Sequence, residues 1–203
     1  MTRKEQKEER KKAILMTALN LFVERGYYDT KITDIAEAVP MSTGLMFHYF
    51  ESKEVLYTEL VRMGAQATTS FGRTGGAGEG GQEAAAGDMN SIRPDIYFTK
   101  FLEGLFAYSK EQPWVFNMFV LMGQARRAGM PEEARQLALS VSAIDSSSKL
   151  IELGQKTGVF REGDPKLIAT CFWATVQGIM EEMAVDKTLD SPDPEWIVAI
   201  LKK

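Results

Sequence analysis

Apolar residues recur along this chain at the spacing of helix faces, and nowhere do they alternate with a period of two. From Ile14 to Phe22 they follow the i, i+4, i+7, i+8 pattern of one helix face. From Phe98 to Phe106 a similar pattern returns at i, i+3, i+4, i+7 and i+8. Because a half-buried strand needs alternation, the sequence predicts an all-α fold.

Composition excludes several kinds of function. The 203 residues are 44% apolar, which suffices for the core of one large or two small domains. The net charge of −4 gives no general basic excess, so any nucleic-acid binding must rest on a local surface. Cys171 and His48 are the single cysteine and histidine, which argues against metal cages and Ser-His-Asp triads. We therefore expect no catalytic residues, no metal and no cofactor, and we expect Cys171 to be a small core residue.

The distribution of charges also bears on location. The longest uncharged stretch near the C-terminal end, from Leu167 to Met180, is too short to span a bilayer. The segment from Met1 to Lys12 is charged rather than apolar, unlike a secretory signal. We expect a cytoplasmic protein with no membrane partner.

Two short helices with a brief turn between them are predicted early in the chain. The first runs from Ile32 to Val39, with Thr30 available to cap it, and it ends because the residue before Pro40 avoids the α region. Ser42 caps the second helix, and Ser52 caps a longer helix that follows. Such a pair is typical of a helix-turn-helix.

The string ITDIAEAVPMSTGLMFHYFESKEVLY, residues 32–57, resembles the DNA-binding domain of the TetR family of transcriptional regulators. The resemblance in motif covers roughly residues 12–60, and the remainder is similar only in architecture. It implies an N-terminal three-helix helix-turn-helix DNA-binding domain in residues 1–52. A C-terminal helical domain for ligand binding and dimerisation would follow in residues 53–203, with a flexible glycine-rich loop at residues 72–90.

A recognition helix lies in the major groove with its first turn against the bases. Ser42 would direct free N–H groups toward phosphates, while Thr43 reaches a base beside the clearance left by Gly44. The resemblance implies further contacts from the helix that crosses the backbone and from the segment after the first turn. The predicted DNA-binding residues are Thr33, Ser42, Thr43, Gly44, Leu45, Phe47, His48, Tyr49 and Lys53. For His48 a surface residue without a role remains the alternative.

Two residues depart from the family pattern. Pro40 stands where the family usually has glycine, and the backbone conformation that the proline ring favours cannot copy a left-handed glycine. We therefore expect an adjusted crossing of the two helices. Phe47 stands where tyrosine is common and lacks a hydroxyl for phosphate. Affinity would then rest more on Tyr49, Lys53 and the basic N-terminal segment, residues 3–12.

One helix-turn-helix reads only a half-site, so useful affinity implies a homodimer on a palindromic double-stranded DNA operator. The helices predicted over residues 166–185 and 194–201 are best placed to pair about a two-fold axis, with packing within one chain as the alternative. The interface would bury Trp173, Gly178, Met180, Trp196 and Ile200.

The second part of the chain carries a surplus of aromatic rings and thioethers, which predicts an apolar pocket for a hydrophobic small-molecule effector. Asn117 and Ser148 interrupt apolar faces, so they either line this pocket or are hydrogen-bonded core residues. The predicted ligand-binding residues are Phe98, Phe101, Leu105, Trp114, Asn117, Met118, Met122, Ser148 and Phe172.

These observations predict a homodimeric TetR-type regulator, a repressor that such a ligand releases from DNA. One alternative is a small all-α carrier or enzyme for a hydrophobic ligand that does not bind DNA, although the chain lacks a paired acid–base set. Another is a helical protein-interaction module, which would show no salt-dependent affinity for DNA.

Overall fold

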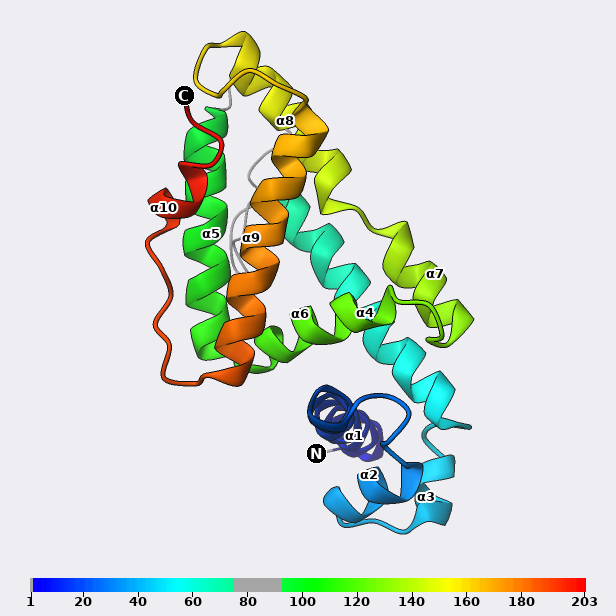
Figure 1. Ribbon diagram of the computed structural model, residues 1–203. Helices are drawn as coiled ribbons and strands as arrows, with labels where there is room; N and C mark the ends of the chain where they lie inside the picture. Colours follow the sequence, from blue (N-terminus) through cyan, green and yellow to red (C-terminus); the bar gives the residue numbers. More distant parts are fainter. Residues whose placement is uncertain (1, 75–92) are drawn as a thin grey trace. The chain divides into compact units, whose positions relative to one another are not determined.

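The computed structural model describes residues 2–74 and 93–203, and within those ranges every regular element is a helix (Figure 1). The helices are α1 (Arg3–Arg25), α2 (Ile32–Ala38), α3 (Thr43–Phe47), α4 (Lys53–Thr74), α5 (Pro94–Glu111), α6 (Trp114–Ala125), α7 (Glu132–Ser140), α8 (Ala143–Lys156), α9 (Pro165–Val185) and α10 (Pro194–Val198). The predicted all-α class is confirmed. None of the described helices is both long enough and apolar enough to cross a membrane.

Contacts divide the chain into two compact units. The first comprises Met1–Ala65 and Asn117–Ser140, and the second comprises Gln66–Phe116 and Val141–Lys203. The first unit thus includes the start of α4 and most of α6 and α7, in addition to the expected helix-turn-helix. The functional division at residues 52 and 53 stays a prediction. Of the predicted loop at residues 72–90, residues 72–74 close α4, and the rest lies outside the described residues.

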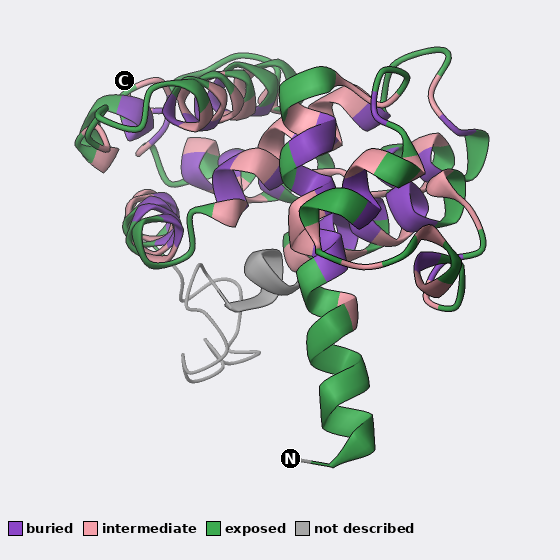
Figure 2. Ribbon diagram, turned by 90° about the horizontal axis from the view of Figure 1, so that it is seen from below, coloured by how far each residue is buried: buried purple, intermediate pink, exposed green. Residues whose placement is uncertain are grey.

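Helix α1 begins in a reciprocal cap. The Glu5 N–H donates to Thr2 Oγ1 at 3.2 Å, and the Thr2 N–H donates to Glu5 Oε2 at 2.7 Å. Its first turns are exposed (Figure 2), and burial starts at Ile14, where the apolar stripe begins. The helix ends at Gly26, whose φ of 83° is accessible to glycine.

The turn after α2 is strained at Pro40. Its φ is 26°, in the left-handed region, although the pyrrolidine ring favours about −65°. The Met41 N–H donates to the Ala36 carbonyl at 3.0 Å, which is the longer bond of a Schellman cap with residue 40 in the position glycine usually takes. The expectation that proline cannot take the left-handed conformation here is therefore wrong.

Replacing Pro40 by glycine should stabilise the first unit. Glycine relieves the strained φ and restores an N–H that can donate to the Glu37 carbonyl, the shorter bond of this cap. Strain of this kind costs about 1–3 kcal/mol, and the greater freedom of unfolded glycine offsets part of the gain. We expect Pro40→Gly to raise the free energy of unfolding by about 1 kcal/mol in urea titrations. A free energy of unfolding below that of the wild type would show that the proline ring stabilises this turn.

The second unit is built on contacts between α8 and α9, with α5 and α10 packed against them. Its interior holds Phe98, Phe160 and Phe172, with ring centroids 6.0 Å apart for Phe98 and Phe160 and 4.9 Å apart for Phe98 and Phe172. The Phe160 ring lies directly against Gly154 of α8, where a Cβ would come within 2.2 Å of its Cδ2 atom. The glycine is thus required by this close approach.

Candidate nucleic-acid interface

The single-turn helix α3 is anchored on one side and open on the other. Met46 is fully buried, and Phe50, just after the helix, is almost so. Ser42 caps the start, its Oγ accepting from the Leu45 N–H at 3.2 Å. Phe47, which is 48% exposed, points away from the core. The two buried side chains fix the helix, so its other face stays available to a partner.

Helix α2 contacts both α1 and α3 and completes the helix-turn-helix. Ile35 and Ala36 are its buried positions, while Thr33 is exposed. Asp34 accepts from the Lys31 N–H at 2.9 Å near the helix start. Thr30, expected to cap α2, is instead fully buried, and its hydroxyl donates to the Gly26 carbonyl at 2.8 Å. That expectation is wrong because the hydroxyl closes the corner between α1 and α2.

The predicted DNA contacts fall on α2, on α3, on the residues that flank α3 and on the first residue of α4. Thr33, Ser42, Gly44, Phe47 and His48 are exposed, and the other predicted contacts, Thr43, Leu45, Tyr49 and Lys53, are half-buried. A Cβ added to Gly44 would meet no atom within 4 Å, so packing inside the chain does not require glycine there. Open space on this side suits the close approach of a partner. Contact with DNA stays a prediction for each residue.

Lys53 has partners within its own chain. Its Nζ donates to the Tyr27 carbonyl at 2.7 Å and to the Thr30 carbonyl at 2.9 Å, and it lies 4.3 Å from the centre of the Tyr27 ring. Partial burial lowers the pKa of Lys53, and the nearby carboxylates of Asp29 and Asp34 act in the opposite direction. An ammonium group has three N–H donors, so one remains for a phosphate. No sequence pattern indicated this link between α4 and the α1–α2 corner, because both acceptors are backbone carbonyls.

An aromatic cluster supports the same corner. The Tyr57 ring is fully buried, 4.8 Å from the Tyr27 ring and 5.2 Å from the Phe22 ring. Burial raises the pKa of Tyr57, so the phenol stays neutral at physiological pH. Helix α4 is thereby fixed to α1 immediately after α3.

The predicted ligand-binding residues fall in both units. In the second unit, Phe98, Phe101, Leu105 and Phe172 are buried, and Trp114 is half-buried. In the first unit, Met118 and Met122 pack on α4, where a Cβ on Gly64 would lie 2.9 and 2.6 Å from their sulfur atoms. These observations place the residues in cores but do not test ligand binding.

The two polar pocket candidates are both hydrogen-bonded within the chain. Asn117 Nδ2 donates to Asn20 Oδ1 at 2.8 Å, and Ser148 Oγ donates to the Asp145 carbonyl at 2.9 Å. The buried serine of α8 is the neighbouring Ser147, which accepts from Trp173 Nε1 at 2.8 Å. Sequence periodicity did not separate the two serines.

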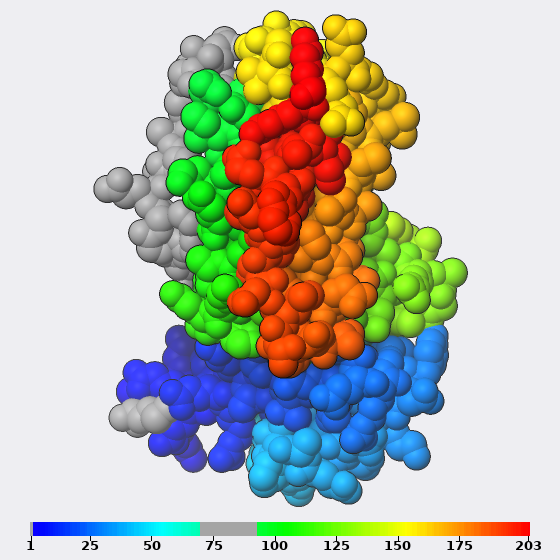
Figure 3. All heavy atoms as spheres, turned by 60° about the vertical axis from the view of Figure 1, so that its left-hand side comes forward, coloured from blue at the N-terminus to red at the C-terminus, as the bar shows by residue number. Residues whose placement is uncertain are grey.

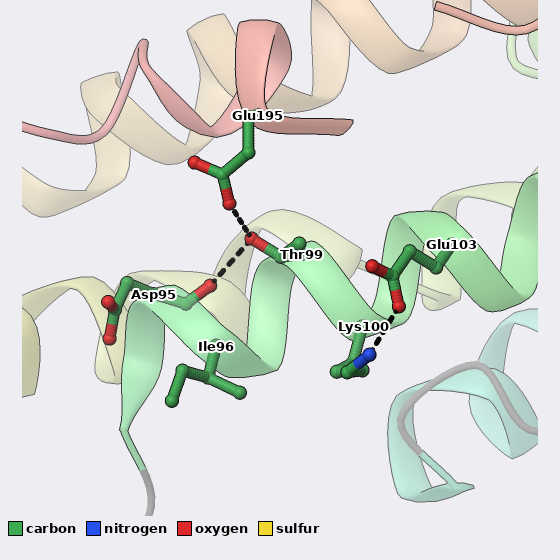
Figure 4. A pocket seen from close by; sticks show the side chains of 6 residues that line it. All are labelled: Asp95, Ile96, Thr99, Lys100, Glu103 and Glu195. Carbon is green, nitrogen blue, oxygen red and sulfur yellow. Dashed lines mark hydrogen bonds and ion pairs between the residues drawn. The ribbon is translucent and has the colours of Figure 1, made fainter. Parts of the chain in front are cut away.

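A depression of about 240 Å³ opens at the surface of the second unit (Figure 4). Ile96 is the one apolar residue in its lining, and the others are polar or charged. Thr99 Oγ1 donates to Glu195 Oε1 at 2.8 Å, and Lys100 pairs with Glu103 at 2.7 Å. No predicted ligand-binding residue lines it. Its charged lining does not suit a hydrophobic effector.

Helix α9 has an exposed stripe of mostly apolar and small residues. The apolar and small members recur at helical spacing and are Leu167, Cys171, Ala174, Gly178 and Val185, and the exposed Glu182 lies on the same face. Val185 is 82% exposed, and Trp196 of α10 is 72% exposed. Figure 3 shows α10 and part of α9 at the surface of this unit. Two expectations are wrong: Cys171 is exposed rather than buried, and Met180 is fully buried in its own chain rather than at an interface.

Comparison with known proteins agrees with this arrangement. The family described as "Bacterial regulatory proteins, tetR family" matches residues 14–60. HTH-type transcriptional regulator RutR of Escherichia coli (strain K12) is 25% identical over 173 residues, which cover 83% of this chain and 72% of RutR. The TetR family regulator PfmR from Thermus thermophilus is 23% identical with a TM-score of 0.68, covering 93% of this chain and 96% of PfmR. AibR is 17% identical with a TM-score of 0.62, covering 94% of each chain.

The match to the family lies on α1 to α4, where the buried anchors and open face of α3 were found, and the likeness in fold extends over the rest. The family consists of transcriptional regulators rather than enzymes. The chain thus carries, in residues 14–60, the region that defines the TetR family of bacterial regulatory proteins, and the fold of its described residues is similar to that of TetR family regulators.

Proposed function

We propose that the protein is a homodimeric repressor that binds a palindromic operator in the cytoplasm and is released by a hydrophobic small molecule. The observation that carries the proposal is the asymmetry of α3, with Met46 buried and Phe47 and Gly44 facing solvent. A helix anchored in this way can enter the major groove without disturbing the core. The proposed DNA contacts are the residues predicted from the sequence.

Dimerisation is supported by the exposed stripe on α9 together with Trp196. Large apolar side chains exposed at the surface of one unit are typical of an interface in a soluble protein. Gly178 and Ala174 would let two copies of α9 approach closely across a two-fold axis. Two recognition helices could then read half-sites one turn of duplex apart, about 34–36 Å.

Release by a ligand is supported by the aromatic interior of the second unit. The rings of Phe98, Phe172 and Trp173 pack edge to face, and such contacts can be rearranged around an apolar guest. AibR, which shares the fold, was crystallised with isovaleryl coenzyme A and operator DNA. We propose that the effector enters among the predicted ligand-binding residues of the second unit. A hundredfold preference for the DNA-incompetent state would weaken operator binding by about 2.7 kcal/mol.

Thr43→Ala should lower specificity for the operator. Thr43 lies in the first turn of α3, where a side chain meets base edges, so its loss should weaken operator binding about tenfold and random DNA hardly at all. The operator is first selected from a random duplex pool with the purified protein, and the affinities are then measured by fluorescence anisotropy. Thr188→Ala, an exposed threonine of the second unit, is the matched control. Failure to select any sequence, or unchanged discrimination in Thr43→Ala, would overturn the proposal.

A further inference from the structure

The first three turns of α1 separate charges by sign. Basic residues stand at i, i+1, i+4, i+7 and i+8 of one face, and they are Arg3, Lys4, Lys7, Arg10 and Lys11. Glu5, Glu8 and Glu9 lie on another face, at i, i+3 and i+4. A mixed run of charges in sequence thus becomes a one-sided basic surface, the basic face, once the segment is helical.

The basic face continues the stripe by which α1 packs onto the rest of the first unit. The buried stripe contains the same spacing, beginning at Ile14 where the basic face begins at Arg3, and it has one further member, Leu19. Its members are Ile14, Leu15, Ala18, Leu19, Leu21 and Phe22. The displacement from Arg3 to Ile14 is close to three whole helical turns, so the basic face and the buried stripe lie on the same side of α1. The basic face therefore points to the side on which α1 meets its own unit.

The contacts of Lys11 identify the part of the first unit that lies on this side of α1. Its Nζ lies 3.0 Å from Glu59 Oε1 of α4 and 5.8 Å from the centre of the Phe50 ring, just after α3. The basic face thus starts beside the connection from α3 to α4. From there it runs outward to Arg3 for about 12 Å, since each of the eight residue steps rises about 1.5 Å.

The four outer cations have no ionic partner in the part of the chain that the structure describes. Arg3, Lys4, Lys7 and Arg10 are exposed, and none forms an ion pair with a described residue. Figure 2 shows the first turns of α1 as an exposed stretch of helix. The facing glutamates do not neutralise them, although Lys4 and Glu8 stand four residues apart. An anionic surface outside the chain would fit these cations.

We propose that the basic face binds the phosphate backbone of duplex DNA beside the segment read by α3. The proposal rests on the DNA-binding function proposed above and assigns a second, sequence-independent contact to it. Duplex DNA carries one negative charge per about 1.7 Å of its axis, so a helix segment of about 12 Å can meet several phosphates. A lipid surface fits less well, because residues 3–12 contain no apolar side chain and interfacial helices require an apolar face.

The test replaces Arg3, Lys4, Lys7 and Arg10 by glutamine in the full-length chain. Glutamine has a similar helix propensity and these side chains are exposed, so thermal unfolding should be unchanged. Affinity is measured by anisotropy from 50 to 200 mM salt, on the selected operator and on a random 30-bp duplex. Each lost phosphate contact should reduce the slope of log K against log salt by about 0.9. We expect a reduction of at least 2 and a tenfold or greater loss on both duplexes.

The matched control carries the same change of charge in the second unit, at the exposed residues Lys100, Lys110, Lys156 and Lys187. The control should keep the wild-type slope, and Lys4→Arg with Lys7→Arg should keep full binding. An unchanged slope in the quadruple glutamine variant, or an equal loss in the control, would overturn the proposal. The proposal would also be overturned if the quadruple glutamine variant lost binding to phosphatidylglycerol vesicles but kept its binding to DNA. A wild-type chain that selects no sequence but still shows the slope change would contradict only the operator function.

Discussion

Glutamates introduced together at Ala174 and Gly178 should leave the chain folded, abolish the dimer and lower operator affinity at least 100-fold. Both residues are exposed on α9, and a Cβ on Gly178 would meet no atom within 4 Å, so the substitutions should fit within one chain. In an isologous interface each glutamate would face its symmetry copy, and like charges brought together without water are strongly unfavourable. A monomer reads one half-site and loses the second recognition helix.

Sedimentation equilibrium gives the oligomeric state of this variant, and anisotropy on the selected operator gives its affinity. Circular dichroism should show the wild-type helix content and cooperative unfolding, with a lower thermal midpoint because dimerisation no longer stabilises the folded chain. The control pair Ala107→Glu and Thr157→Glu adds the same charge at exposed positions on α5 and at the end of α8. A dimer that survives glutamates at 174 and 178 would place the interface elsewhere. A monomer with full affinity would show that dimerisation is dispensable for DNA binding.

Lys53→Met should weaken both the stability of the first unit and its binding to DNA. The methionine keeps the aliphatic stem but removes two hydrogen bonds from an ammonium group to the carbonyls of Tyr27 and Thr30. Hydrogen bonds to charged groups contribute about 1.5–3 kcal/mol, so we expect a loss of about 2 kcal/mol in the free energy of unfolding. Operator affinity should fall more than tenfold, because α4 no longer fixes the corner behind α3.

Urea unfolding and operator titration of the same preparation separate the two roles of Lys53. Lys12→Met removes an exposed lysine of the same unit and should change the free energy of unfolding little. If Lys53 acted only on phosphate, affinity would fall while the free energy of unfolding stayed at the wild-type value. That result would contradict the structural role given to its two carbonyl partners.

Helix starts could be predicted closely because their signals are local. Ser42 caps α3 as expected, and the proline at the start of α9 lies one residue before the predicted beginning. The apolar stripe of α1 also agrees with the buried residues. Caps and periodicity depend on neighbours within about one turn, so the sequence contains them.

The predictions that were wrong or incomplete concern features that tertiary contacts determine. The buried residues of α9 recur at helical spacing and include Met180, four residues after Val176, but apolar and small residues also occupy the opposite face, so composition did not show that Cys171 faces outward. The left-handed φ of Pro40 goes against the preference of its ring, so the local sequence does not predict it. Lys53 donates to the carbonyls of Thr30 and Tyr27, which lie 23 and 26 residues earlier in the chain, at the corner between α1 and α2. No pattern of side chains encodes that approach.

The outer turns of α1 are held by the cap at Thr2 but have no packed neighbours among the described residues before Lys11. Isolated helices of such length are only marginally stable in water, so these turns should unfold and refold rapidly. Their backbone amides should exchange with deuterium much faster than those after Ile14. The loss of conformational entropy when these turns become ordered then opposes any association they take part in. Sequence changes that only raise helix propensity there should tighten such an association without adding a contact.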